Sequence, residues 1–162
     1  MKLYRLERTQ ELGTNLEETW KFFSNPYNLE RITPHDMNFQ ILSSPPKTIH
    51  SGLIIEYRIT LPPGIPISWV TEIKHVEAPY RFVDEQRFGP YRFWYHEHRF
   101  QPSQNGTIMV DMVSYQMPLG WLGRLIHFLS VHDQLHRIFN FRFDYLQHHF
   151  NSIITSNGEI HE

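Results

Sequence analysis

The sequence predicts an α+β domain in which an antiparallel sheet of about six or seven strands packs against one long C-terminal helix. Two observations carry this prediction. Between residues 37 and 117, short runs of alternating apolar and polar residues are separated by turns rich in Gly, Pro and Asn, which is typical of antiparallel strands. After Pro118 the apolar residues recur at the spacing of an amphipathic helix.

The N-terminal segment predicts a first strand and two short helices. Residues 2–12 alternate as a strand does, and the turn that follows supplies Asn15 as a helix N-cap. The first helix ends at Asn25, because Pro26 follows it. A second short helix is expected over residues 27–32, before Pro34.

The remaining elements follow from the same patterns. We expect strands at residues 39–42, 53–61, 67–73, 81–88, 93–100 and 107–117. One apolar stripe predicts a helix over most of residues 121–150, and it consists of Leu125, Leu129, His132, His136, Phe139, Phe143, Leu146 and Phe150. The chain is long enough for one domain, which we place at residues 1–150, with a frayed tail at 151–162.

Composition excludes several classes of function. The formal charge is −2 and there is no block of Lys and Arg, so nucleic acid is not an expected partner. There is no cysteine, which excludes disulfides and thiolate chemistry, and no Gly-rich phosphate loop follows a strand. No apolar run is long enough for a membrane helix, and the N-terminus lacks the apolar core of a signal peptide. We therefore expect a soluble cytoplasmic protein without stable membrane insertion and without a cofactor.

The strand expected at residues 93–100 is the most informative segment. Alternation places Trp94, His96, His98 and Phe100 on one face, which is aromatic and carries two titratable groups. The opposite face consists of Tyr95, Glu97 and Arg99, and it is expected to face solvent. Such an inner face is suited to line a pocket.

Asp84 is the candidate acid–base partner of these histidines. It shares a strand face with Phe82, Gln86 and Phe88, so we expect Asp84 and Gln86 to point inward. A carboxylate beside His96 or His98 would fix the tautomer of a general base. The alternative is that Asp84 only pairs with a nearby arginine, because a buried carboxylate needs a partner.

A metal site is a further interpretation of the histidines. His96 and His98 could supply two ligands, and His132 and His136, one turn apart on the long helix, could supply the others. The alternative is that all four are half-buried polar side chains with ordinary hydrogen bonds. Because no complete ligand motif is present, no metal is expected.

Arg142 lies on a mainly apolar surface of the long helix. Its planar guanidinium could clamp the carboxylate or polar head of a ligand. The preferred interpretation is a structural pair, for which the candidate acids are Asp84, Asp111 and Glu72.

Aromatic residues supply the candidate walls of a pocket. These are Trp69, Trp94, Phe100, Phe139 and Phe143, with Thr71 on the same strand face as Trp69. A packed core uses the same kinds of residue, so only a cavity volume separates the two interpretations.

The order of elements, and several segments, resemble the SRPBCC or START-like superfamily, in particular its bacterial ligand-binding branch, which is also loosely labelled cell-division-inhibitor-like. The matching segments are Trp20-Lys-Phe-Phe-Ser-Asn-Pro26, Leu29-Glu-Arg-Ile-Thr-Pro34, Gly52, Tyr57-Arg58, Trp69-Val-Thr-Glu-Ile73, Phe82-Val-Asp-Glu-Gln86, Gly89-Pro-Tyr91, Trp94-Tyr-His-Glu-His98, Asp111 and Tyr115. The resemblance implies a helix-grip fold, in which a curved sheet grips the long helix over a cavity. It also implies hydrophobic ligands such as lipids, sterols and polyketides.

Three functions follow as expectations. The first is a noncatalytic binder or carrier of a small hydrophobic molecule, with Trp69, Thr71, Asp84, Gln86, Trp94, His96, His98, Phe100, Phe139, Arg142 and Phe143 as ligand-binding candidates. The second is a polyketide cyclase-like or dehydratase enzyme that uses His96, His98 and Asp84 as acid and base. The third is an interaction or regulatory module without a ligand, and homodimerisation stays open in each case. The fold alone does not choose among them.

Overall fold

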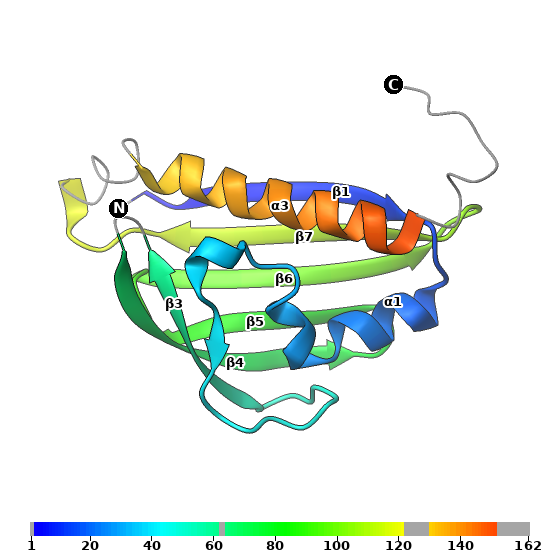
Figure 1. Cartoon of the computed structure of the whole chain (residues 1–162), viewed down its shortest axis with the longest axis horizontal. Helices are drawn as coiled ribbons and strands as arrows, with labels where there is room; N and C mark the ends of the chain where they lie inside the picture. The colour runs from blue at the N-terminus through cyan, green and yellow to red at the C-terminus, as the bar shows by residue number, and fades with distance from the viewer. Residues whose placement is uncertain (1, 62–63, 122–129, 152–162) are drawn as a thin grey trace.

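The computed structural model describes residues 2–61, 64–121 and 130–151 of the chain. Its centre is a curved, antiparallel, seven-stranded sheet in the order β1-β7-β6-β5-β4-β3-β2 (Figure 1). The strands are β1 (Tyr4–Leu12), β2 (Gln40–Ile41), β3 (Ile54–Leu61), β4 (Ile65–Glu77), β5 (Arg81–Phe88), β6 (Phe93–Pro102) and β7 (Thr107–Gln116). The predicted α+β class and the predicted strands are therefore confirmed.

The N-terminal helices lie between β1 and β2 in the chain. Helix α1 (Leu16–Phe23) starts at the predicted cap, where the Asn15 side chain accepts a hydrogen bond of 2.9 Å from the Glu18 backbone N–H. The second helix is not an α-helix over 27–32 but a 3₁₀ helix, η1 (Pro26–Leu29). Two prolines, at 26 and 34, bound this segment, and one short 3₁₀ turn fits between them. A further 3₁₀ turn, η2 (His35–Met37), follows.

Helix α3 (His132–Asn151) lies across the β1 side of the sheet (Figure 1). Its buried side chains include Leu135, Phe139 and Leu146, which agrees with the predicted apolar surface. The predicted start of this helix and the predicted frayed tail fall largely on residues 122–129 and 152–162, which lie outside the described residues. Among the described residues, no helix is both long and apolar enough to cross a membrane.

The register of the central strands brings distant polar residues together. Asp84 of β5 pairs with His96 of β6, and His98 of β6 pairs with Asp111 of β7. Since residues that are directly opposite in an antiparallel pair share a face, all four side chains lie on the inner face. This juxtaposition positions the candidate site.

The far end of β5 departs from the predicted alternation. Thr71 pairs with Gln86 but Val70 pairs with Phe88, so β5 carries one extra residue at this point. Such a bulge turns the following side chain to the other face, and Phe88 is 64% exposed instead of pointing inward.

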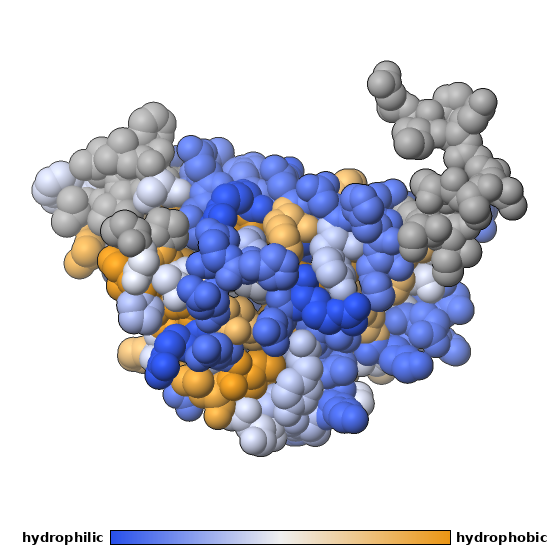
Figure 2. Space-filling view, viewed as in Figure 1, coloured by the Kyte–Doolittle hydropathy of each residue, from blue (hydrophilic) through white to orange (hydrophobic). Residues whose placement is uncertain are grey.

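The outer face of β6 also differs from the expectation in one residue. Glu97 is only 7% exposed, although its strand position predicts a solvated side chain. Arg81 and Arg99 cover it, and each donates hydrogen bonds to its carboxylate. In the view of Figure 2 the surface is largely hydrophilic, and apolar side chains gather on the side where β3 and β4 lie.

Candidate functional site

A cavity of about 380 Å³ lies between the inner face of the sheet, the N-terminal helices and α3. Most of its wall is apolar and includes Ile32, Met37, Ile55, Ile59, Trp69 and Phe139. The charged residues of the wall are Asp84, His96, His98 and Arg142. The cavity therefore combines apolar walls with a small group of charges.

The wall contains most of the side chains that the sequence nominates. Those on the wall are Trp69, Thr71, Asp84, Trp94, His96, His98, Phe139 and Arg142. Three nominated residues, Gln86, Phe100 and Phe143, lie elsewhere among the described residues.

Each of these three placements has a local cause. Gln86 holds the turn after β5, because its amide donates to the Tyr91 carbonyl at 2.7 Å and accepts from the Tyr91 N–H at 3.2 Å. Phe100 is 1% exposed and packs in the core between Trp20 and Phe82. Phe143 is 40% exposed and lies beside Arg8 and Gln10 of β1, outside the cavity wall.

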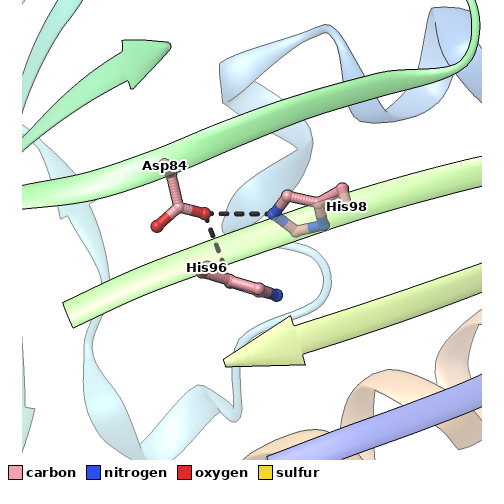
Figure 3. A group of neighbouring side chains, drawn as sticks. All are labelled: Asp84, His96 and His98. Atoms are coloured by element: carbon pink, nitrogen blue, oxygen red, sulfur yellow. Dashed lines mark hydrogen bonds and ion pairs between the residues drawn. The ribbon is translucent and has the colours of Figure 1, made fainter. Parts of the chain in front are cut away.

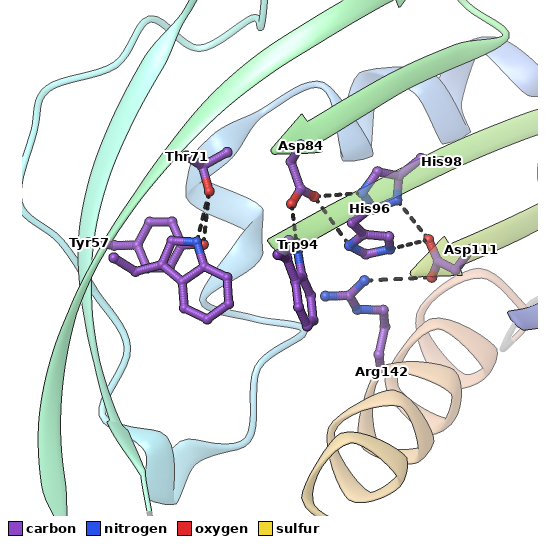
Figure 4. Close-up of polar contacts among 9 residues, drawn as sticks. Tyr57, Thr71, Asp84, Trp94, His96, His98, Asp111 and Arg142 are labelled. Carbon is purple, nitrogen blue, oxygen red and sulfur yellow. Dashed lines mark hydrogen bonds and ion pairs between the residues drawn. The ribbon is translucent and has the colours of Figure 1, made fainter. Parts of the chain in front are cut away.

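Two histidines and two aspartates form one network at the polar end. Asp84 Oδ2 lies 3.2 Å from His96 Nδ1 and 3.0 Å from His98 Nε2 (Figure 3). Asp111 Oδ1 lies 3.1 Å from His96 Nε2 and 2.7 Å from His98 Nδ1, the last contact being too poorly aligned for a hydrogen bond (Figure 4). Every imidazole nitrogen of the pair therefore faces a carboxylate.

The charges of the network support one another. Burial favours the neutral form of each group, but the carboxylates of Asp84 and Asp111 outweigh it and raise the pKa of His96. In the same way, burial opposes ionisation of Asp84 and Asp111, and the two histidines outweigh it and lower the pKa of both carboxyls. A protonated His96 is a donor at both ring nitrogens, which matches its two acid neighbours.

Arg142 completes the polar end. It is 7% exposed, and its Nη1 lies 3.6 Å from Asp111 Oδ2, so Asp111 is the acid that pairs with it. Glu72 pairs instead with Lys74 and Arg87 on the sheet. The Nε and Nη1 groups of Arg142 have no hydrogen-bond partner among the described residues. This guanidinium lines the cavity with unused donor capacity.

A smaller polar group lies elsewhere on the cavity wall. The Trp69 indole N–H donates to the Thr71 hydroxyl oxygen at 3.1 Å, and the Tyr57 hydroxyl shares a hydrogen bond with the same oxygen at 3.1 Å (Figure 4). Burial, followed by the charge of Asp84, raises the pKa of Tyr57 well above its usual value, so this phenol is neutral.

The helix histidines are not part of the site. His136 Nδ1 contacts Arg8 of β1 at 2.8 Å, and His132 contacts its neighbour Asp133 at 3.0 Å. Both lie near the β1 edge of the sheet, so the interpretation that joins them to His96 and His98 is wrong. Val131 and Leu135 of the same turns line the cavity, whereas the two histidines do not.

Two members of the site are not among the ligand-binding candidates of the sequence, although the sequence names Asp111 as a candidate structural partner of Arg142, which agrees with their ion pair. Asp111 alternates with Met109 and Val113 on the inner face of β7, and this alternation is the signal that places it inward. Tyr57 shares an inward face with Ile55 and Ile59, and this pattern predicts a core residue. Only its hydrogen bond with Thr71 shows that its hydroxyl belongs to the site.

Comparisons with known proteins establish the fold alone. The chain matches no protein family and no curated protein. It is similar to the solved structure of a protein from Mycobacterium smegmatis, with a TM-score of 0.64 and 14% identity over 95% of this chain and 92% of that one. A protein from Chromobacterium violaceum has a TM-score of 0.66 and 13% identity over 90% and 95%.

A third similar structure is longer. It is a nucleoside-diphosphate sugar epimerase from Corynebacterium glutamicum, with a TM-score of 0.62 and 20% identity over 87% of this chain but 28% of the epimerase. The arrangement of an antiparallel sheet and a C-terminal helix is thus shared with bacterial proteins at identities that carry no function.

Proposed function

We propose that the protein binds a small hydrophobic molecule with a polar head in the cavity between the sheet and α3, as a START-like helix-grip protein of the SRPBCC superfamily. The observation that carries this proposal is the cavity itself, whose apolar wall ends at a buried group of charges with unused donors. Its volume of about 380 Å³ lies in the range of small-molecule pockets.

The apolar wall of the cavity favours an apolar occupant. Burial of apolar surface contributes about 25 cal/mol per Å², and water is a poor partner for this part of the wall because it needs several polar partners.

Arg142 favours an occupant with an acceptor at one end. Its Nε and Nη1 donors lack hydrogen bonds, and a buried guanidinium gains more from a charged acceptor than from a neutral one. The ligand class is therefore an amphipathic molecule, such as a fatty acid or an acidic polyketide, whose head lies near Arg142 and whose body contacts the apolar wall.

A binding titration with a fluorescent fatty-acid analogue tests the proposal. Ile59→Trp places a larger side chain in the cavity, where Ile59 is 6% exposed. The matched control is Ile65→Trp, since Ile65 is 53% exposed on the adjacent strand. We expect Ile59→Trp to weaken binding by about tenfold or more and the control to leave it unchanged. Equal binding by both folded variants would contradict the proposal.

One observation favours an enzyme as the second candidate. Asp84, His96 and His98 line the same cavity, and buried groups with shifted pKa values beside a pocket are typical of acid–base sites. The reaction would be a cyclisation or dehydration of a polyketide-like substrate, in which protonated His96 gives a proton to the substrate oxygen and His98 or Asp84 removes one from carbon. The enzyme hypothesis is tested by turnover of a poly-β-keto thioester analogue. Turnover that is lost in His96→Gln and kept in His136→Gln would support the hypothesis, and no turnover by the wild type would contradict it.

A further inference from the structure

Three side chains on the cavity wall present metal-ligand atoms to a common point. One ligand atom from each of Asp84, His96 and His98 lies within 4.8 Å of the others, and all three residues line the cavity (Figure 3). We infer that this triad is a binding site for a divalent first-row transition metal such as Zn²⁺ or Fe²⁺. Asp84 supplies the third ligand that the sequence pattern leaves open.

The distances suit such a centre. Metal–nitrogen and metal–oxygen bonds of about 2.0 to 2.2 Å place neighbouring ligand atoms about 3.0 to 3.5 Å apart. The carboxylate oxygen of Asp84 lies 3.2 Å from His96 Nδ1 and 3.0 Å from His98 Nε2. A cation can therefore replace the two bridging protons, and the two imidazole nitrogens, which lie within 4.8 Å of one another, would draw together around it.

Asp111 orients His96. Its Oδ1 lies 3.1 Å from His96 Nε2 in a hydrogen bond, and a metal-bound histidine commonly donates its second N–H to a carboxylate in this way. His98 Nδ1 also faces Asp111 Oδ1, at 2.7 Å, but it is not aligned for a hydrogen bond. Unlike the triad, Asp111 is not part of the cavity wall, so the ligand atoms and the orienting carboxylate lie on separate sides of the imidazoles (Figure 4).

The donor set defines the class of metal. Two imidazoles and one carboxylate suit Zn²⁺ and Fe²⁺, whereas Mg²⁺ and Ca²⁺ prefer oxygen ligands alone. Three protein ligands leave at least one coordination position open, and it faces the cavity. The metal site goes beyond the proposed ligand binding and stands independently of it, because its ligands are protein groups only.

The test is a metal titration of the full chain after chelation and removal of bound lipid. The background is His132→Gln with His136→Gln, because a surface histidine pair one turn apart can itself hold a metal. With Zn²⁺ or Co²⁺ as the probe, we expect about one bound ion per chain. Bound Co²⁺ should also show the visible absorption of a nitrogen–oxygen site and quench the fluorescence of Trp94, whose indole donates to Asp84 at 3.3 Å.

The ligand variants complete the test. In the same background, Asp84→Asn or His98→Gln should weaken Zn²⁺ binding by about a hundredfold or more with an unchanged circular-dichroism spectrum. If the background protein binds less than about a tenth of an ion per chain, or if a folded ligand variant keeps its affinity, the inference is wrong. The background titration decides the matter even if a ligand variant does not fold. The fatty-acid titration of Ile59→Trp and Ile65→Trp is measured on metal-free protein, so the two proposals fail separately.

Discussion

Removing the charge of Asp111 is the perturbation with the clearest energetic consequence. Asp111 is 4% exposed and contacts His96, His98 and Arg142, of which Arg142 is 7% exposed. In Asp111→Asn, the side chain keeps its shape but no longer balances the guanidinium. The variant therefore leaves a buried positive charge without its counter-ion.

We expect Asp111→Asn to cause a large loss in the free energy of unfolding. Breaking one side of a buried pair costs about 3 to 5 kcal/mol, which in a domain of this size lowers the melting temperature by about 6 to 20 °C. The exposed pair Asp36–Arg137 is the matched control, with side chains 62% and 44% exposed. Its contact of 2.8 Å is shorter than the 3.6 Å between Asp111 and Arg142, yet Asp36→Asn should cost about 1 kcal/mol or less, because solvent screens it.

Urea unfolding followed by circular dichroism measures both costs. Adding Arg142→Met to Asp111→Asn should recover part of the loss, since the unpaired charge is then removed, and the two changes should differ from additivity by about 1 to 3 kcal/mol. A cost for Asp111→Asn as small as that of Asp36→Asn, or strict additivity with Arg142→Met, would refute the reasoning.

Three further predictions concern the ligand, pH and a turn. Arg142→Gln should weaken binding of an anionic-headed probe by about ten- to a hundredfold, whereas Arg137→Gln on the same helix should not change it; equal effects in the titration would contradict the assigned head position. Unfolding free energy should be highest between about pH 4 and 6.5. The pKa of Asp84 is lower in the folded protein than in the unfolded chain, where it is near 3.8. This difference stabilises the fold above pH 3.8, and the stabilisation is lost as the pH falls through the folded pKa. The pKa of His96 is higher in the folded protein than in the unfolded chain, where it is near 6.5. The resulting stabilisation is complete below pH 6.5 and is lost as the pH rises through the folded pKa. A free energy of urea unfolding that stays constant from pH 3 to 9 would contradict the network. Gly106→Ala should lose about 1 to 3 kcal/mol, because φ is +152° and the new Cβ would overlap the last carbonyl oxygen of β1; an unchanged unfolding midpoint would contradict this.

Local patterns predict the elements of this fold well. The alternation in β6 predicts which side chains point inward, and His96, His98 and Phe100 are indeed buried. The misassigned faces arise from nonlocal events. A bulge opposite β4 turns Phe88 outward, and two arginines on neighbouring positions bury Glu97.

The candidate site is predictable only in part, because its members come from different strands. Alternation places His96 and His98 on one face and nominates Asp84 as their partner, but only the strand register reveals that Asp111 lies on their other side. Register depends on which strands pair and where bulges fall, and neither is visible in a single strand's pattern. The place of Arg142 beside Asp111 likewise depends on how α3 crosses the sheet.

The most direct test of the central proposal is native mass spectrometry of the purified chain, compared with the same sample after unfolding. The account predicts a bound small molecule that adds to the mass of the folded chain and is released on unfolding, with an apolar body and an acidic or polar head. If the wild type shows only the bare chain mass, both as purified and after incubation with a mixed lipid extract, the proposal that the cavity binds such a molecule is contradicted.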